Sequence, residues 1–128
     1  MSYYLNKVLK LSFGESIQKV SEELKKEGFG IITEIDVQAT LKKKININFR
    51  SYRILGACNP SFAYQALQVE DKIGTMLPCN IIVQCLDEKR TEVAAIDPVS
   101  AMGRMGNQNL LNIAQQVQSK LRKVIEAL

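Results

Sequence analysis

Two of the three cysteines in this sequence stand in similar settings. Cys58 ends an apolar run and precedes Asn59-Pro60, while Cys79 follows Pro78 and precedes Asn80. Cysteine is the strongest nucleophile that such turns display, and two thiols that meet can form a redox pair or a soft-ligand site. If the fold brings the two turns together, Cys58, Asn59, Cys79 and Asn80 are candidate ligand-binding residues.

The histidine count is zero, which excludes several kinds of site. Ser-His-Asp and Cys-His catalysis both need an imidazole, as do histidine-ligated zinc and haem. The cysteines lie 21 and 6 residues apart, which does not match the spacing of a CxxC metal site. We therefore expect no metal, and the sequence assigns neither a cofactor nor a reaction.

Each candidate residue also has a purely structural interpretation. Cys58 would lie just before a helix that begins at Pro60, where free amides and the helix dipole favour a thiolate. Alternatively, it is one small residue of a closely packed corner. Asn59 and Asn80 are typical of a helix cap and a turn. Both interpretations remain open.

Two aspartates follow predicted strands, and a third cysteine lies within one. Asp36 and Asp97 are typical of helix caps or Asx turns, and they become candidate acids or bases only if they lie at the same end of the sheet as Cys58. Cys85 alternates with Ile81 and Val83 along the chain, so we expect it to be buried in the core.

The pattern of apolar residues predicts one α+β domain over residues 1–128. The expected order is strand, helix, strand, short helix, strand, helix, strand, strand, helix. The predicted ranges are 3–11, 13–28, 29–35, 37–44, 50–57, 60–73, 79–86, 91–96 and 108–128. The short link between 86 and 91 requires an antiparallel hairpin. We expect a five-stranded, mainly antiparallel sheet with helices packed against it.

The charge and the hydropathy of the sequence limit the classes of partner that the protein could bind. The net charge is +4, but the lysines fall mainly on predicted helix faces and no nucleic-acid-binding motif accompanies them, so nucleic acid is an unlikely partner. No segment is apolar enough to span a membrane, and the N-terminus does not resemble a signal peptide. We therefore expect a cytoplasmic protein. An apolar seam from Leu110 to Leu128, or a strand edge, could form a homodimer.

Four segments together resemble a known family. Thr33–Asp36, Tyr52–Pro60, Leu77–Asn80 and Asp97-Pro98 are similar to the pattern of family 302 of the domains of unknown function. The resemblance implies a fold similar to the TATA-binding-protein-like class and a homodimer. It implies no activity, substrate or cofactor, and the likeness to a DNA-binding fold does not predict DNA binding.

The sequence therefore favours two functional hypotheses over a third. The first is a small-ligand or thiol-dependent site at the Cys58 and Cys79 turns, with Asp36 and Asp97 as further candidates and a small anionic or sulfur-containing molecule as the ligand. The alternative is a homodimeric association module without catalysis. Nucleic-acid binding through the lysine-rich faces is a weaker third hypothesis.

Overall fold

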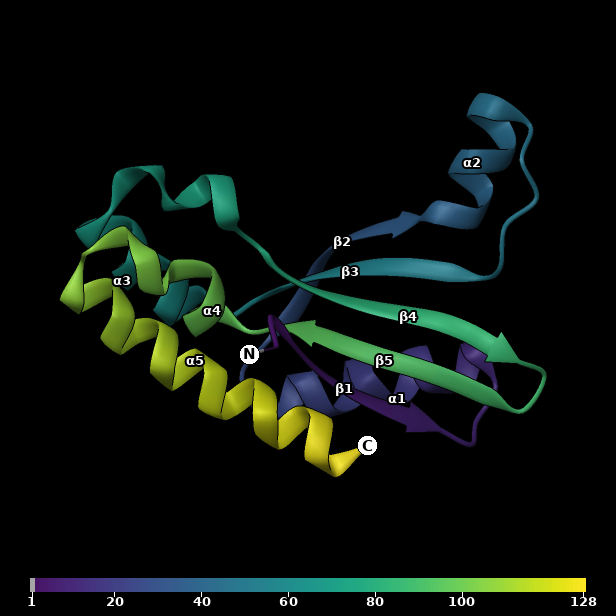
Figure 1. Ribbon diagram of the computed structural model, residues 1–128. Helices are drawn as coiled ribbons and strands as arrows, with labels where there is room; N and C mark the ends of the chain where they lie inside the picture. Colours follow the sequence, from purple (N-terminus) through teal and green to yellow (C-terminus); the bar gives the residue numbers. More distant parts are fainter. Residues whose placement is uncertain (1) are drawn as a thin grey trace.

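The sheet has five antiparallel strands. The structure is a computed structural model that describes residues 2–128. Helices cover one face of the sheet (Figure 1). The strands lie in the order β1-β5-β4-β3-β2, and each pairs antiparallel with its neighbours. Their bounds are β1 Tyr4–Leu9, β2 Gly30–Asp36, β3 Tyr52–Cys58, β4 Cys79–Asp87 and β5 Arg90–Ile96. The α+β class and the closing hairpin are confirmed.

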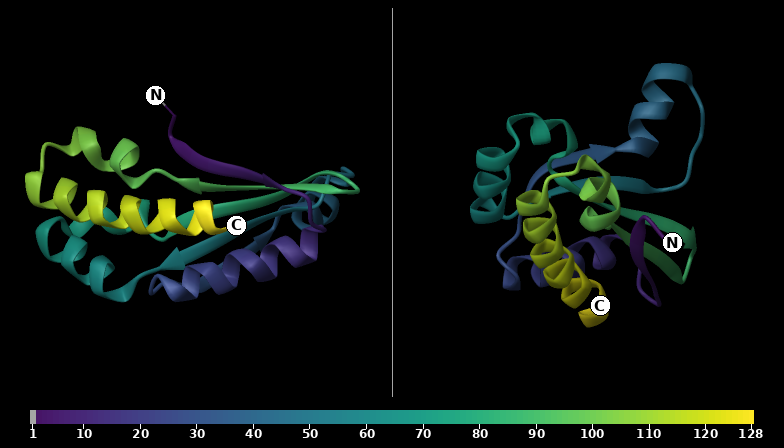
Figure 2. Two further views of the ribbon diagram at one scale, coloured as in Figure 1. Left: turned by 90° about the horizontal axis from the view of Figure 1, so that it is seen from below. Right: turned by 60° about the vertical axis from the view of Figure 1, so that its left-hand side comes forward.

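The helices connect these strands or follow them. They are α1 Phe13–Lys26, α2 Val37–Ile45, α3 Pro60–Val69, α4 Pro98–Met102 and α5 Gln108–Ala127, with two 3-10 segments, η1 Asp71–Met76 and η2 Gly103–Met105. As Figures 1 and 2 show, α2 stands apart from the other helices, beyond the end of β2 and the start of β3. Among the described residues, no helix has the length and apolar character needed to cross a membrane.

Local sequence signals account for α1. Ser12 and Glu15 form a capping box, in which Glu15 N donates to Ser12 Oγ at 3.2 Å and Ser12 N donates to Glu15 Oε1 at 3.4 Å. The chain leaves the helix through Gly28, whose φ of +86° suits glycine. Between these ends, Val20 and Leu24 are fully buried against the sheet.

Alternation along the central strands places the core on the helix-covered face. Leu55 of β3 lies opposite Ile81 of β4, and Val83 lies opposite Val93 of β5. These four side chains are buried in the core. Helix α1 packs against β4 and β5, and α5 packs against β1 and β5 with its own apolar seam, including Leu110 and Leu121. Because the seam is buried inside the domain, it is not free to bind a second copy, and that form of the association hypothesis is wrong.

Several local expectations differ from the structure. The third predicted helix ends at Val69, and Ile73 lies in η1. The first strand ends at Leu9 rather than Leu11. Cys85 is half-buried rather than fully buried, although it does point to the same face as Val83. It lies beside the bulge that precedes the hairpin, and its thiol donates a hydrogen bond to Asp87 O at 3.2 Å.

Candidate functional site

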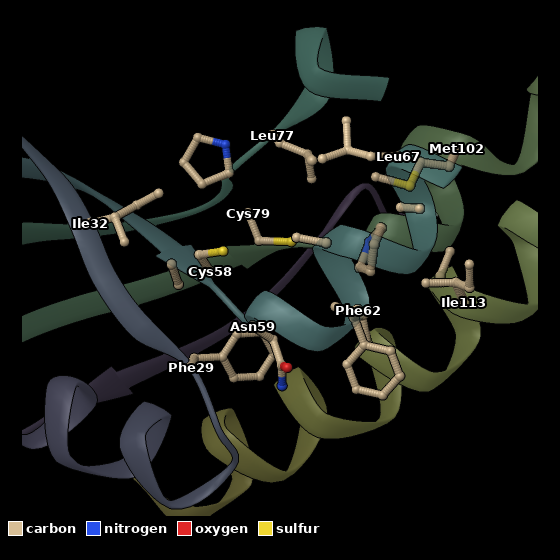
Figure 3. A pocket seen from close by; sticks show the side chains of 17 residues that line it. Phe29, Ile32, Cys58, Asn59, Phe62, Leu67, Leu77, Cys79, Met102 and Ile113 are labelled. Carbon is tan, nitrogen blue, oxygen red and sulfur yellow. The ribbon is translucent and has the colours of Figure 1, made fainter. Parts of the chain in front are cut away.

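The two cysteine turns meet at one end of the sheet. Strands β3 and β4 run antiparallel, with Ala57 opposite Cys79, so the last residue of β3 lies beside the first residue of β4. Figure 3 shows the side chains of Cys58 and Cys79 beside the same space, and both are free thiols. Cys79 is buried and Cys58 is half-buried.

A cavity of about 300 Å³ opens beside these thiols. It lies between the end of the sheet and helices α3, α4 and α5 (Figure 3), and none of the charged side chains among residues 2–128 lines it. Its walls are almost entirely apolar. The lining residues are Phe29, Ile32, Ala57, Cys58, Asn59, Phe62, Ala63, Ala66, Leu67, Leu77, Pro78, Cys79, Pro98, Met102, Ile113, Ala114 and Val117.

Asn59 fixes one wall of the cavity by a route that the sequence did not suggest. It occupies the cap position of α3, with Pro60 as the first helical residue, but its side chain makes no capping hydrogen bond. Its Nδ2 instead donates to Glu27 O at 3.3 Å. A Cβ on Gly28 would lie 3.1 Å from that Nδ2, so glycine leaves room for this contact. Asn59 therefore ties the end of α1 to the turn after β3.

Gly56 allows three segments to approach closely beside the thiols: strand β2, strand β3 and the turn that precedes β4. A Cβ built at this position would lie 2.6 Å from Pro78 Cγ and would overlap Thr33 Oγ1. Both distances are shorter than side chains tolerate, so only glycine fits without movement. Pro78, whose peptide bond with Leu77 is cis, lines the cavity. The glycine before Ala57-Cys58 thus sets the position of one cavity wall.

The apolar surroundings control the protonation of the inner thiol. Burial, with a smaller contribution from the neighbouring Cys58, raises the pKa of Cys79 to about 11. Cys79 is therefore a neutral thiol near pH 7. It presents a polarizable sulfur to the cavity rather than a thiolate nucleophile.

Residues 5–128 match the domain of unknown function DUF302. The chain belongs to the DUF302 family. A crystal structure of an uncharacterized conserved DUF302 protein from Bacillus stearothermophilus is similar to it, with a TM-score of 0.90 and 25% sequence identity over 98% of each chain. No curated protein matches the sequence. The proposed likeness to TATA-binding-protein-like folds stays a prediction.

Asp97 lies at the cavity end of this DUF302 domain, but its carboxylate is occupied. It caps α4, since Oδ1 accepts from Val99 N at 3.0 Å and from Ser100 N at 3.3 Å. Gln118 Nε2 from α5 donates to both carboxylate oxygens, at 2.9 and 3.0 Å. These contacts fix Pro98 at the cavity wall, so Asp97 positions the wall and does not itself line the cavity.

Asp36 and Asn80 are not brought to the cavity. Asp36 pairs with Arg53, at the opposite end of β3 from Cys58, and it caps α2 through Ala39 N at 2.9 Å. Asn80 lies opposite Gly56 and is exposed on the face of the sheet that the core helices leave open. The alternation of a strand explains this, because residues 79 and 80 must point to opposite faces.

Most of the cavity lining could not be recognised in the sequence. Phe62 lies within the predicted helix 60–73, and Met102 lies between the predicted ranges 91–96 and 108–128. The one available signal is small side chains on helices that face each other. Ala63 and Ala66 of α3, with Ala114 of α5, leave space that larger residues would fill. That signal has meaning only when the pairing of α3 with α5 is known.

Proposed function

We propose that this domain binds a small, uncharged and largely apolar molecule in the cavity beside Cys58 and Cys79. The observation that carries the proposal is the cavity itself, about 300 Å³ in volume and walled by apolar side chains. This volume is about ten times the ~30 Å³ that one water occupies in the liquid. It lies at the lower end of the range of small-molecule sites.

The few polar groups at the cavity indicate which features of a ligand could be recognised. Nδ2 of Asn59 is used by Glu27 O, so its side-chain oxygen is the available acceptor. The thiols of Cys58 and Cys79 offer weak donors and polarizable sulfur. The Asn59 oxygen and the two thiols would suit a molecule that has one hydrogen-bond donor and is otherwise apolar or sulfur-containing. Its body would be held by contact with Phe29, Phe62 and neighbouring side chains.

Binding is favoured over thiol catalysis at Cys79. A nucleophilic or redox cysteine acts as its thiolate, and the raised pKa of Cys79 keeps that thiol protonated near neutral pH. No histidine is present in the sequence to accept the proton. The thiols are therefore proposed to contribute contact and selectivity, and a chemical reaction is not required.

Fluorescence titration with N-phenyl-1-naphthylamine, an uncharged apolar probe, tests the proposal. We expect saturable binding with one site per chain. Ala63→Leu places a larger side chain in the cavity and should weaken binding at least tenfold. Ala127→Leu is the matched control, since Ala127 is exposed on α5, and it should leave the affinity unchanged.

A second measurement removes the dependence on the shape of one probe. Benzene and indole are added separately to protein with labelled Leu and Ile methyl groups, and the methyl shifts of Leu67 and Ile113 are followed by NMR. Either small probe should shift these methyl signals in the wild type but less in Ala63→Leu. If none of the three probes binds, or if all bind both proteins equally, the proposal is refuted.

A further inference from the structure

The cavity at the end of the sheet is buried at one end and open at the other. We call the buried end the floor, where α4 and α5 contribute side chains that are at most 7% exposed, Met102, Ala114 and Val117. We call the open end the mouth, which is lined by Ile32, 62% exposed, and Leu67, 43% exposed. Figure 3 shows Ile32 and Leu67 on opposite sides of the space. A molecule that fills the cavity therefore extends from the interior of the domain to its surface.

A β-bulge places Ile32 at the mouth. Ile31 lies opposite Ala57 and Thr33 lies opposite Gly56, so Ile32 is the extra residue between two successive pairs of β2 and β3. A bulge redirects a side chain away from regular alternation, and bulges are common beside binding sites. Ile32 lines the cavity and is nevertheless largely exposed to solvent. An apolar ligand that reached the mouth would bury surface that the domain itself leaves exposed.

The side chains between the mouth and the floor favour a ligand body without hydrogen-bonding groups. Apart from Asn59 and the two cysteines, every lining side chain is apolar. A polar group on the ligand that found no partner there would lose its hydrogen bonds to water. Asn59 is half-buried, whereas the floor residues are buried, so its free acceptor oxygen lies nearer the surface than the floor does. The one suitable place for a hydrogen-bond donor of the ligand is therefore towards the mouth.

We propose that the cavity takes an unbranched aliphatic chain, with its methyl end at the floor and an uncharged donor, such as a hydroxyl group, at the mouth. This inference rests on the proposed function, since it names the class of apolar molecule that the same cavity binds.

The size of the cavity favours a chain over a single ring. Its volume of about 300 Å³ equals about ten groups of the ~30 Å³ that one water occupies, and a methylene group is of similar size. A chain of about ten carbons would therefore fill the cavity and cover Ile32 and Leu67. Benzene fits an apolar cavity of ~150 Å³, so one such ring would occupy about half of the space and leave the mouth uncovered.

A series of 1-alkanols, from 1-butanol to 1-undecanol, tests the chain. Their binding is followed by displacement of N-phenyl-1-naphthylamine and, independently of that probe, by the methyl shifts of Leu67 and Ile113. The affinity should rise about fourfold with each added carbon, the factor that corresponds to ~0.8 kcal/mol for one buried methylene group. The rise should level off near about ten carbons, because the cavity is then full. Decanoate should bind at least tenfold more weakly than 1-decanol at pH 7.5, since none of the described cationic side chains lines the cavity.

Two substitutions at the floor should move the chain length at which the affinity levels off. Ala114→Leu adds carbons to the floor and should shorten the preferred chain by about three carbons. Met102→Ala removes side-chain atoms from the floor and should lengthen the preferred chain by a similar number. Ala127→Leu makes the first change at an exposed position of α5 and should leave the series unchanged. Because the two floor variants act in opposite directions, one of them suffices if circular dichroism shows that the other fails to fold.

A substitution on α3 tests the mouth. Leu67→Ser removes apolar surface there and should weaken the binding of 1-decanol at least fourfold. The shorter chain of 1-hexanol can lie below Leu67, so its affinity should not change. Tyr64→Ser is the matched control, since Tyr64 is exposed on the same helix but does not line the cavity, and it should bind both alcohols as the wild type does.

The outcomes separate this inference from the proposed function. If N-phenyl-1-naphthylamine, benzene or indole binds but the affinity of the alkanols does not rise with length, the aliphatic chain is refuted and the apolar cavity site stands. Decanoate that binds as tightly as 1-decanol overturns the uncharged end group. A series that levels off at the same length in the wild type, Ala114→Leu and Met102→Ala overturns the placement of the chain end at the floor. If neither the ring probes nor the alkanols bind, the proposed function fails, and this inference fails with it.

Discussion

Gly56→Ala should destabilise the domain, because this glycine lies where three segments meet. The added methyl group would lie 2.6 Å from Pro78 Cγ, whereas ordinary contacts begin at 3.4 Å, so the ring must retreat by about 0.8 Å. The overlap with Thr33 Oγ1 is more easily relieved, since Thr33 is exposed and can rotate. Pro78 is held by its neighbours in the chain and therefore determines most of the cost.

We expect a loss of about 2 kcal/mol in the free energy of unfolding, within the range of overpacked sites. For a chain of this length the loss corresponds to a fall in Tm of roughly 6–10 °C. Urea unfolding followed by circular dichroism measures the free energy. Because Pro78 lines the cavity, the same variant should also change the affinity for N-phenyl-1-naphthylamine.

Gly30→Ala is the matched control. Gly30 lies at the same end of the sheet, on β2, and a Cβ there would have no atom within 4 Å. Its replacement should be neutral or should stabilise by a few tenths of a kcal/mol through the unfolded chain. Adding Thr33→Ala to Gly56→Ala should recover only a minor part of the loss. If Gly56→Ala costs no more than Gly30→Ala, the close-approach argument is wrong.

Two further predictions concern Cys79 and Asp97. Burial raises the pKa of Cys79 from 9.0 to about 11, so between these pH values the native state retains a proton that the unfolded chain has released. The free energy of unfolding should therefore fall as pH rises from 9 to 11, and Cys79→Ala should reduce this fall; an unchanged slope would refute the assignment. Iodoacetamide at pH 7.5 should label Cys79 more slowly than Cys58 and Cys85, as read by mass spectrometry of the peptides. Asp97→Ala should cost about 1–2 kcal/mol, more than Gln118→Ala, since it removes the α4 cap and leaves the Gln118 amide without its acceptor; equal costs in urea unfolding would contradict the capping role.

Much of the fold follows from local signals in the sequence. The Ser12 capping box and the hairpin after β4 depend on residues within a few positions of each other, and both are observed. The face of β4 that carries Ile81, Val83 and Cys85 was also predicted, since strand alternation has a fixed period. Cys85 belongs to that face but is not fully buried. Burial depends on how far the helical layer extends, and this is a property of the assembled domain.

The candidate site could be predicted only in part, because its geometry depends on contacts between distant segments. Cys58 and Cys79 line one cavity, but the sequence had left open whether their two turns meet. Asn59 looked like a helix cap, yet it bonds to Glu27 O, which is 32 residues away in the chain. Asp36 lies at the other end of the sheet because β2 runs antiparallel to β3, and strand direction had not been fixed by the sequence.

The apolar lining of the cavity indicates whether a charged ligand could bind there. The sequence suggested an anion at the start of α3, and this stays a prediction. However, Pro60 has no N–H, so one of the four amides that are usually free at a helix start is missing here. No cationic side chain lines the cavity, and moving an unpaired charge into apolar surroundings costs several kcal/mol. Because the Cys79 thiol is neutral as well, these surroundings favour an uncharged molecule selected by its shape and by contact with sulfur.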